Sequence, residues 1–562
     1  MKRVATSLRK TVLDAFPHKS DYQGLTKSWS ADLLAGITVG IVALPLALGF
    51  GIASGVGATP GIFTAIVAGI VAAIFGGSSV QVSGPTGAMA VILLPIAAHD
   101  GAGAVQSIAI MAGVLVLAMG FSGLGRMIQI VPWSVLEGFT FGIAITIGLQ
   151  QVPLLLGRRG PSGTSVIDSA RRAVAGASRG SSTNTLLLGA FVVAVMLLWP
   201  RVSRRVPASF VAVILATTVA AVMHLSVPTI ASLPSHLPAP KLPSLGVASL
   251  RRLFGPALAV ATLAALESLL SARVADGMTG ARSSDRREMF GQGLANIASG
   301  LFGGMPATGA IARTALNVRS GAKSRLSAIV HSVFIIGVIL MATPLVTKIP
   351  LAVLGAVLIV TAAKMINHAK VRRVLRVHLT EAVTFALTAT VTVAVNLVTA
   401  IEVGLLAAAV LALREISSTS GVFQEGLEQH HDGPVDETAF LAEHIAILRF
   451  DGALFFGAAT KFEDSIRDVS QVDVVIFRMK GVTLIDSSGA ESFARIVHSL
   501  DSRGIIVLLK SALSDHNRLL SVSTVFNDLD AKGHVFDDLS AAIAHARRHV
   551  EDLGLFNQPD AT

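Results

Sequence analysis

The sequence predicts a polytopic α-helical membrane protein that ends in a smaller α/β domain. Hydrophobic residues make up 52% of its 562 residues and charged residues only 14%, a composition too apolar for an ordinary soluble protein. Apolar stretches of spanning length recur between Asp32 and Arg414, whereas a β-barrel would show short alternating strands. After Glu443 the pattern changes to short hydrophobic strands separated by helical segments.

The apolar stretches predict about fourteen membrane segments. A proline-rich divide at 226–250 separates two sets of seven, over residues 31–225 and 251–415. Two segments that begin near Thr86 and Thr308 are counted as half-spans, and the remaining pieces are short, broken or fused. The continuous candidates are 33–53, 58–75, 104–121, 132–149, 185–199, 208–223, 253–272, 326–343 and 379–397.

Two short motifs repeat at matching points of the two sets. Ser83-Gly84-Pro85-Thr86-Gly87-Ala88 and Pro306-Ala307-Thr308-Gly309-Ala310 each follow a Gly-Gly pair, and their threonines lie 222 residues apart. Proline and glycine end one helix and allow another to begin, so each motif can open a half-helix whose free amide groups attract an anion. Paired breaks of this kind point to the binding site of a transporter, although small residues also allow close helix packing.

The distribution of charge indicates the topology. Residues 1–30 are basic and polar, without the pattern of a cleaved signal peptide, and the positive-inside rule places them in the cytoplasm. An even number of passes returns the chain to the cytoplasm after Arg414, so the α/β domain is expected there too. Most basic loops agree, but the arginine-rich loop 157–183 falls on the outside, and we treat it as an exception to a statistical rule.

Composition also excludes some classes of function. The net charge of +10 reflects membrane topology rather than nucleic-acid binding. A nucleic-acid-binding surface would interleave basic with aromatic residues, but the chain has only one tyrosine and three tryptophans. The absence of cysteine excludes disulfides and thiol catalysis.

The α/β domain is expected over residues 443–552, after a linker at 416–442 and before a tail at 553–562. Strands that alternate with helices imply a largely parallel sheet. Between the second strand and the second helix, Asp486-Ser487-Ser488-Gly489 holds serine and aspartate, which suit a helix cap. The predicted strands are 446–450, 474–479 and 504–509, and the predicted helices are 459–467 and 488–500.

The segment Asp486-Ser487-Ser488-Gly489 also resembles the Asp-Ser/Thr-x-Gly region of STAS domains, the fold shared with anti-sigma-factor antagonists. In the antagonists the serine before the glycine accepts a phosphate, which makes Ser488 a candidate regulatory phosphosite. A simple N-cap role for Ser488 is the favoured alternative. The resemblance also implies a regulatory protein partner at this domain.

The membrane segments are similar to those of the SulP family of anion transporters. The likeness rests on Leu44-Pro45-Leu46-Ala47-Leu48, on the Ser83–Gly87 motif, on Pro306-Ala307-Thr308-Gly309-Ala310-Ile311-Ala312-Arg313-Thr314-Ala315 and on the STAS tail. It implies two inverted repeats of seven segments, arranged as a gate domain and a core domain that moves as an elevator. It further implies a homodimer in the lipid bilayer of the inner (plasma) membrane.

The same resemblance places the substrate between the two opposed half-helices. The positions of this chain that match the substrate site are Leu46, Phe50, Thr86, Gly87, Ala88, Thr308, Gly309, Ala310, Ala312 and Arg313. Physical reasoning supports the placement, because backbone amides at two facing helix starts can replace part of the hydration of an anion. Arg313 could add a positive field, or it could be a structural arginine.

Glu267 lies well inside an apolar segment, where a charge needs a reason. An apolar environment favours the protonated carboxyl, so Glu267 could carry a coupling proton. Alternatively, Glu267 and Ser271 could hold sodium. The pair resembles an aspartate followed four residues later by a threonine in sodium-coupled bicarbonate transporters of the family. The glutamate and serine of this chain favour proton coupling. A structural ion pair of Glu267 with Arg273 or Arg313 is the other interpretation.

We therefore predict a secondary active transporter of a small oxyanion, with sulfate or bicarbonate as the first candidates and a proton or sodium gradient as the driving force. No Walker motif supports an ATP-driven pump. The alternatives are a C4-dicarboxylate transporter of the same family and an uncoupled anion channel or exchanger. A receptor or an enzyme is disfavoured, because the membrane part shows no nucleophile-base constellation and no metal cluster. No cofactor or metal is expected apart from the coupling ion.

Overall fold

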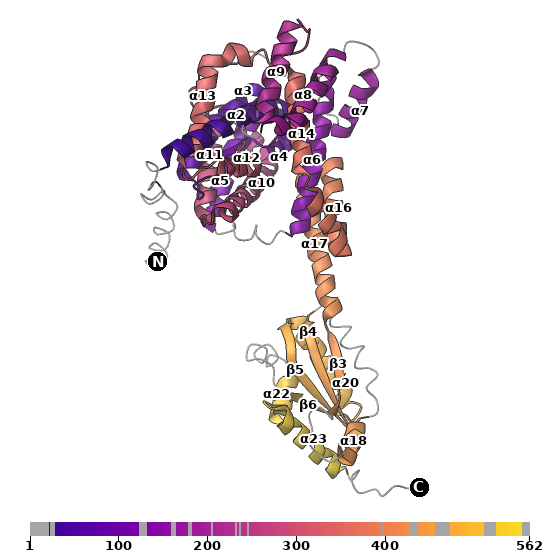
Figure 1. The fold of residues 1–562 in the computed structure, drawn as a ribbon. Helices are drawn as coiled ribbons and strands as arrows, with labels where there is room; N and C mark the ends of the chain where they lie inside the picture. The colour runs from indigo at the N-terminus through magenta and orange to yellow at the C-terminus, as the bar shows by residue number, and fades with distance from the viewer. Residues whose placement is uncertain are drawn as a thin grey trace. The chain divides into compact units, whose positions relative to one another are not determined.

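The computed structural model describes residues 22, 28–122, 132–158, 165–177, 183–203, 206–230, 233–234, 236, 238–243, 247–395, 397–427, 435–455, 472–510 and 524–553. The chain forms two compact units, Met1–Leu406 and Ala407–Thr562. The first is helical and the second contains a sheet (Figure 1). The predicted helix 459–467 and most of the predicted tail lie outside the described residues.

Eight helices of the described chain are long and apolar enough to cross a membrane, and three shorter ones are apolar. With α11, α12 and α17 they make seven helices on each side of the divide, as the sequence predicts. The first set is α2 (Trp29–Ala53), α3 (Ala58–Phe75), α4 (Gly87–Asp100), α5 (Ala102–Ser122), α6 (Trp133–Leu155), α8 (Thr183–Val202) and α9 (Ala208–Val222). The second is α10 (Val247–Thr279), α11 (Asp285–Leu301), α12 (Ile311–Arg319), α13 (Leu326–Val346), α14 (Leu351–Met365), α16 (Leu379–Ala394) and α17 (Leu397–Thr419).

Each set also contains one short polar helix at the same place in its order. Helix α7 (Val166–Ala177) precedes the last two helices of the first set, and α15 (His368–Val377) precedes the last two of the second. Both carry arginines, and neither has the length or the composition of a span. The repeated order therefore extends beyond the apolar segments to the connection between them.

The two predicted half-helices begin where two short strands cross. Strand β1 (Ser83–Gly84) pairs antiparallel with β2 (Thr308–Gly309), and the amide of Ala310 donates to the carbonyl of Val82 at 2.8 Å. Helix α4 follows β1 and α12 follows β2. Since the strands run in opposite directions, the two helices leave the crossing in opposite directions, as two inverted repeats require.

The helices of the first unit pack as two bundles. One bundle contains α2, α3, α5, α10, α11, α12 and α13, with the most extensive packing of α11 against α5 and α3 and of α2 against α13. The other contains α6, α8, α9, α14 and α16, which pack around α6 and α14. The main contacts between the bundles are those of α2 with α9 and α14 and of α4 with α6. We call these the core bundle and the gate bundle, and α4 lies at their junction.

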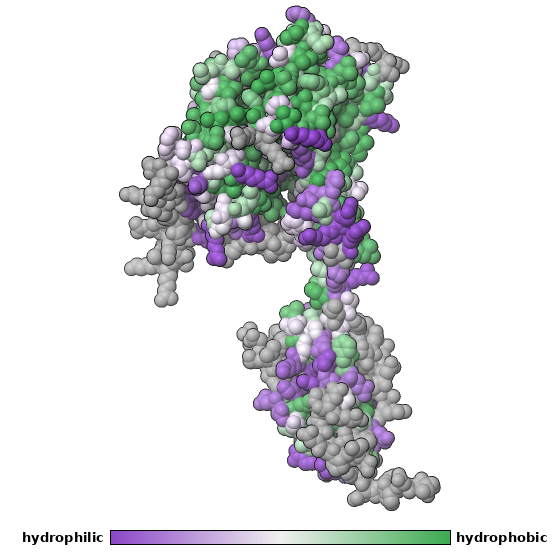
Figure 2. Space-filling model, viewed as in Figure 1, coloured by the Kyte–Doolittle hydropathy of each residue, from purple (hydrophilic) through white to green (hydrophobic). Residues whose placement is uncertain are grey.

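The face of the helical unit seen in Figure 2 carries a large apolar area. On α8, Leu187, Leu197 and Leu198 are more than half exposed, and on α13 Leu340 and Met341 are exposed as well. Side chains of this kind facing outward suit hydrocarbon rather than water, which supports the identification of these helices as membrane segments.

The second unit contains a five-stranded sheet in the order β3-β4-β5-β6-β7. Strands β4 to β7 are parallel, as predicted, and β3 is an antiparallel edge. Strand β3 lies within the stretch predicted as a linker and pairs with β4. The elements are β3 (Gly421–Glu425), α18 (Val435–His444), β4 (Ile445–Leu454), β5 (Val474–Ile485), α20 (Ser487–Asp501), β6 (Ile506–Lys510), α22 (Thr524–Ala531), β7 (Val535–Phe536) and α23 (Leu539–Asp552).

The cap of α20 differs from the role expected for Ser488. The carboxylate of Asp486 accepts a hydrogen bond from the amide of Gly489 at 2.7 Å, so Asp486 is the N-cap. Ser488 is the second residue of the helix and its side chain is exposed. The N-cap interpretation of Ser488 is therefore wrong, because the aspartate two residues earlier reaches the free amide first. Phosphorylation of Ser488 stays a prediction.

Candidate functional site

The first half-helix is tied to the intramembrane acid. Thr86 is the N-cap of α4, and its hydroxyl accepts from the amide of Met89 at 3.5 Å. The same hydroxyl donates to the Glu267 carboxylate on α10 at 3.0 Å. Both side chains are only partly buried. Glu267 therefore lies at the start of α4, joined to the cap residue of that helix.

The second half-helix start is held by serines of α10. The Ser268 hydroxyl accepts from the amide of Gly309 at 2.9 Å and lies 3.0 Å from the hydroxyl of fully buried Thr308. One turn further along α10, the Ser271 hydroxyl lies 2.9 Å from that of Thr314. No hydrogen bond joins Ser271 to Glu267 in the described chain. Ser271 thus contacts α12, and its role in holding sodium stays a prediction.

Arg313 lies in the first turn of α12 and reaches across to the other motif. Its Nη2 donates to the carbonyl of Pro85 at 2.5 Å. Its Nη1 is buried and has no hydrogen-bond partner among the described residues. The guanidinium is close enough to Glu267 for their charges to attract each other. A buried cation with a free donor near two helix starts can bind an anion.

Glycines at the crossing leave little space for a larger side chain. A Cβ atom on Gly84 would lie 2.8 Å from the Arg313 Nη1. On Gly309, a Cβ atom would collide with the side chain of Gln81 and lie 3.0 Å from the Cα of Ser268. The two glycines of the crossing thus leave room for the arginine and for α10.

The remaining predicted site residues fall into an apolar wall and an open helix face. Leu46, Phe50 and Ala88 are buried, and a Cβ atom on Gly87 would lie 3.2 Å from a ring carbon of Phe50 and would collide with Ile147 of the gate bundle. Ala310, the N-cap residue of α12, is buried, whereas Ala312 in the first turn is exposed. Gly87 therefore marks the point where the gate bundle comes nearest to the first half-helix.

Two of the interpretations of Glu267 can be compared with the contacts. Arg273 pairs with Asp285 at 3.6 Å, so the predicted alternative partner is occupied elsewhere. Arg313 is within electrostatic reach of Glu267. In the described part of the chain, however, no ion pair joins Arg313 to Glu267. The acid and the arginine share one site without a direct salt bridge.

A polar stripe on α11, absent from the sequence-based predictions, holds the two crossing segments in place. The Glu288 carboxylate accepts from the amides of Gly77 and Ser78 at 2.9 and 3.2 Å and from the Gln81 side chain at 2.7 Å. Eight residues later, Asn296 donates to the carbonyl of Ala307 and accepts from its amide.

Gln292 lies between these two residues and donates to the hydroxyl of Ser83. The spacing of Glu288, Gln292 and Asn296 by four residues puts them on one face of the helix. That spacing is a signal by which sequence reasoning could have found the stripe.

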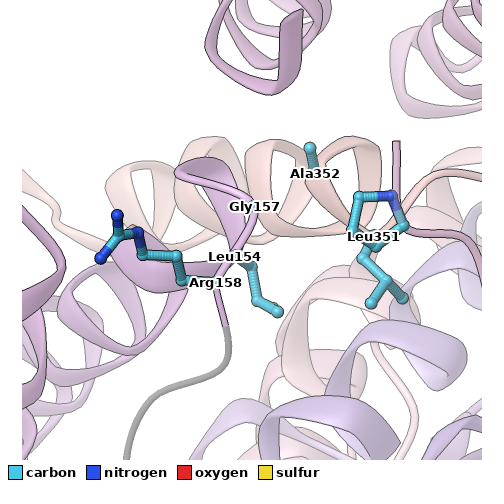
Figure 3. A pocket seen from close by; sticks show the side chains of 6 residues that line it. Leu154, Gly157, Arg158, Leu351 and Ala352 are labelled. Carbon is cyan, nitrogen blue, oxygen red and sulfur yellow. The ribbon is translucent and has the colours of Figure 1, made fainter. Parts of the chain in front are cut away.

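A separate cavity of about 250 Å³ lies away from this site, where α6 ends and α14 begins (Figure 3). It is lined by Leu154, Gly157, Arg158, Pro228, Leu351 and Ala352. The guanidinium of Arg158 points away from Leu154 and Leu351 and donates to the carbonyl of Gly176 at 2.6 Å. None of the substrate-site residues predicted from the sequence lines this cavity.

Known proteins match both parts of the chain. Residues 29–418 match the sulfate permease family, and residues 441–542 match the STAS domain. A protein of Bacillus subtilis (strain 168) described as the putative sulfate transporter YvdB is 33% identical over 522 residues, which cover 91% of this chain and 96% of that protein. The bicarbonate transporter BicA of Synechocystis is 28% identical over 535 residues, covering 92% and 94%.

Solved structures agree with the fold. The transmembrane domain of a cyanobacterial bicarbonate transporter BicA has a TM-score of 0.61 at 30% identity and covers 68% of this chain and 97% of its own. SLC26A9 has a TM-score of 0.83 at 16% identity, covering 98% and 96%. At that identity the second likeness concerns the fold alone.

Proposed function

Because this chain belongs to the sulfate permease family, we propose that it is a secondary active transporter that moves a small oxyanion, sulfate or bicarbonate, together with a proton. The family consists of transporters rather than enzymes, and this chain is a multi-pass membrane anion transporter with a STAS domain. The proposal of proton-coupled oxyanion transport rests on the crossing of β1 and β2. This crossing brings together the two half-helix starts, Arg313 and Glu267.

The anion would bind between the two half-helix starts. The first amide groups of any helix have no acceptor within the helix, and they carry the positive end of the helix dipole. The buried and unpaired Nη1 of Arg313 adds a charged donor, and exposed Ala312 leaves one face of α12 open. Recognition by backbone amides suits sulfate and bicarbonate alike, since both present several acceptor oxygens.

Glu267 would couple the anion to the proton. As a carboxylate it offsets the charge of Arg313 and accepts from Thr86, which lowers the attraction of the site for an anion. Protonation removes that negative charge, so proton and anion binding support each other. A proton is preferred to sodium as the coupling ion, because Ser271 is held by Thr314.

The two bundles suggest how the site changes sides. The half-helices, Arg313 and Glu267 belong to the core bundle and α4, whereas the gate bundle approaches them through Ile147. We propose that the core bundle slides along the gate bundle as an elevator. In a homodimer, contacts between the two copies would hold the gate bundles still. We place the N-terminus and the STAS domain in the cytoplasm. A regulatory protein would bind the STAS domain there.

Uptake into proteoliposomes tests the function. Labelled bicarbonate, sulfate and fumarate are each supplied with a proton gradient, a sodium gradient or neither. Accumulation of bicarbonate or sulfate that requires the proton gradient supports the proposal. Accumulation of fumarate would favour the dicarboxylate alternative, a sodium requirement would replace the proton, and flux without either gradient would indicate a channel or exchanger.

A further inference from the structure

Three histidines gather at one edge of the α/β unit. His534 directly precedes β7, and His545 and His549 lie one turn apart on α23. One nitrogen from each imidazole lies within 4.8 Å of those from the other two. The two Nε2 atoms of the helical pair are 3.1 Å apart, and the ring centroid of His534 lies 5.6 and 5.7 Å from the other two centroids.

The backbone brings these side chains together from two elements. Residues four apart lie on the same face of a helix, so His545 and His549 point in one direction. The third ring comes from the turn after α22, whose backbone is fixed because the amide of His534 donates to Leu529 and its carbonyl accepts from Leu509. A pair of histidines on one helical turn completed by a third ligand is an arrangement that binds transition metals.

We propose that His534, His545 and His549 bind one Zn²⁺ ion, which fastens α23 to the edge of the sheet. Bonds of about 2.0–2.1 Å in a tetrahedral site place ligand nitrogens about 3.3 Å apart, close to the separation of the helical pair. Imidazole ligands without carboxylates favour zinc over magnesium or calcium. The fourth position would hold water. The site uses none of the residues of the transport site and does not rest on the proposed function.

Two contacts must change when the metal binds. The hydrogen bond between the Nε2 atoms of His545 and His549 gives way to bonds to the metal, and the contact of Arg548 with His545 is lost. Arg548 donates to Nδ1 of His545 at 3.2 Å, but a ring that binds metal through Nε2 carries its proton on Nδ1. Arg548 is exposed and can turn away. Replacement of Arg548 by alanine should therefore leave zinc affinity unchanged or raise it, whereas each histidine variant should lower it.

Zinc binding to the full chain tests the site. The protein is purified in detergent without a histidine tag, stripped with a chelator, dialysed against Zn²⁺ and assayed for bound metal. One tightly bound Zn²⁺ per chain is expected. His534→Gln, His545→Gln and His549→Gln should each weaken binding at least about tenfold, which is about 1.4 kcal/mol. His498→Gln, which changes an exposed histidine on α20, is the matched control.

Two further measurements keep the outcome independent of variant folding. Hydrogen exchange should slow by about tenfold over α23 and residues 532–536 when Zn²⁺ is added, and not when Mg²⁺ is added. X-ray absorption of the zinc-loaded wild-type chain should show three imidazole ligands. Equal zinc affinity in the triple histidine variant, or a zinc environment with fewer than two imidazoles, overturns the proposal.

Discussion

The two half-helix starts share a backbone design but differ in chemistry. The start of α4 has a threonine cap and an apolar wall, and it lies against the gate bundle at Ile147. The start of α12 carries Arg313 and is held by Ser268 of α10. The repeat thus supplies two similar helix starts, whereas the residues that differ place Arg313 on one side and the contact with the gate bundle on the other. In the proposed mechanism, coupling and alternating access depend on the residues that differ.

Replacement of Glu267 tests whether its carboxylate links the starts of α4 and α12. We expect Glu267→Gln to abolish concentrative uptake driven by the proton gradient, because the amide cannot take up the proton, while its oxygen still accepts from Thr86. Uptake of labelled anion with and without the gradient measures this, and a binding assay should still detect the anion. Glu137→Gln is the control, since Glu137 pairs with Lys370 away from the site. Normal accumulation by the Glu267 variant would rule out its coupling role.

Removal of the charge tests the α12 side. Arg313→Ala should weaken anion binding by tenfold or more, about 1.4 kcal/mol, because the unpaired Nη1 and its field are lost. Equilibrium binding of labelled sulfate or bicarbonate to detergent-purified protein gives the affinity. Arg273→Ala removes an arginine that pairs with Asp285 and serves for comparison. Unchanged affinity would assign Arg313 to structure alone.

A methyl group tests the α4 side. Gly87→Ala should slow transport by about tenfold while binding changes little, because the added Cβ collides with Ile147 between the bundles. Initial uptake rates over a range of anion concentrations separate the maximal rate from the apparent affinity. Gly103→Ala on α5 has open space around its Cβ and should transport normally. If both variants transport alike, the junction at Gly87 does not limit movement.

A substitution in the polar stripe of α11 should have the smallest effect on coupling. The stripe contacts the segments that lead into α4 and α12, so the substitution should affect the starts of both helices. Asn296→Leu removes two hydrogen bonds to the backbone of Ala307, which should cost about 1–3 kcal/mol of stability. Thermal unfolding in detergent should show a lower midpoint, and the uptake that remains should keep its proton dependence. Loss of that dependence would mean that the stripe takes part in coupling.

Much of the site was predictable because its signals are local. Proline and glycine beside Thr86 and Thr308 mark helix starts in any apolar segment, and an acid such as Glu267 stands out among leucines and alanines. The helical pattern of α20 was equally plain, but the sequence offered both aspartate and serine for its cap, Ser488 among them. Both residues suit a cap, and only the direction of the entering backbone decides which side chain meets the amide of Gly489.

The stripe of Glu288, Gln292 and Asn296 was missed for a different reason. Their spacing shows one polar face, but it does not show that the face meets the segments around Gly77 and Ala307. The three histidines of the α/β unit are similar, since His534 is joined to the helical pair only by the packing of α23 on the sheet.

The sequence by itself determined the membrane fold, the seven-and-seven order and the two broken segments. Lipid offers no hydrogen bonds to the backbone, so about twenty apolar residues dictate a helix and a proline or glycine dictates its interruption. The tertiary structure decided the partners: the pairing of β1 with β2, the reach of Arg313 to Pro85 and the hydrogen bond from Thr86 to Glu267. These contacts join residues about 180 to 230 positions apart, and packing of the whole core bundle rather than local spacing selects them.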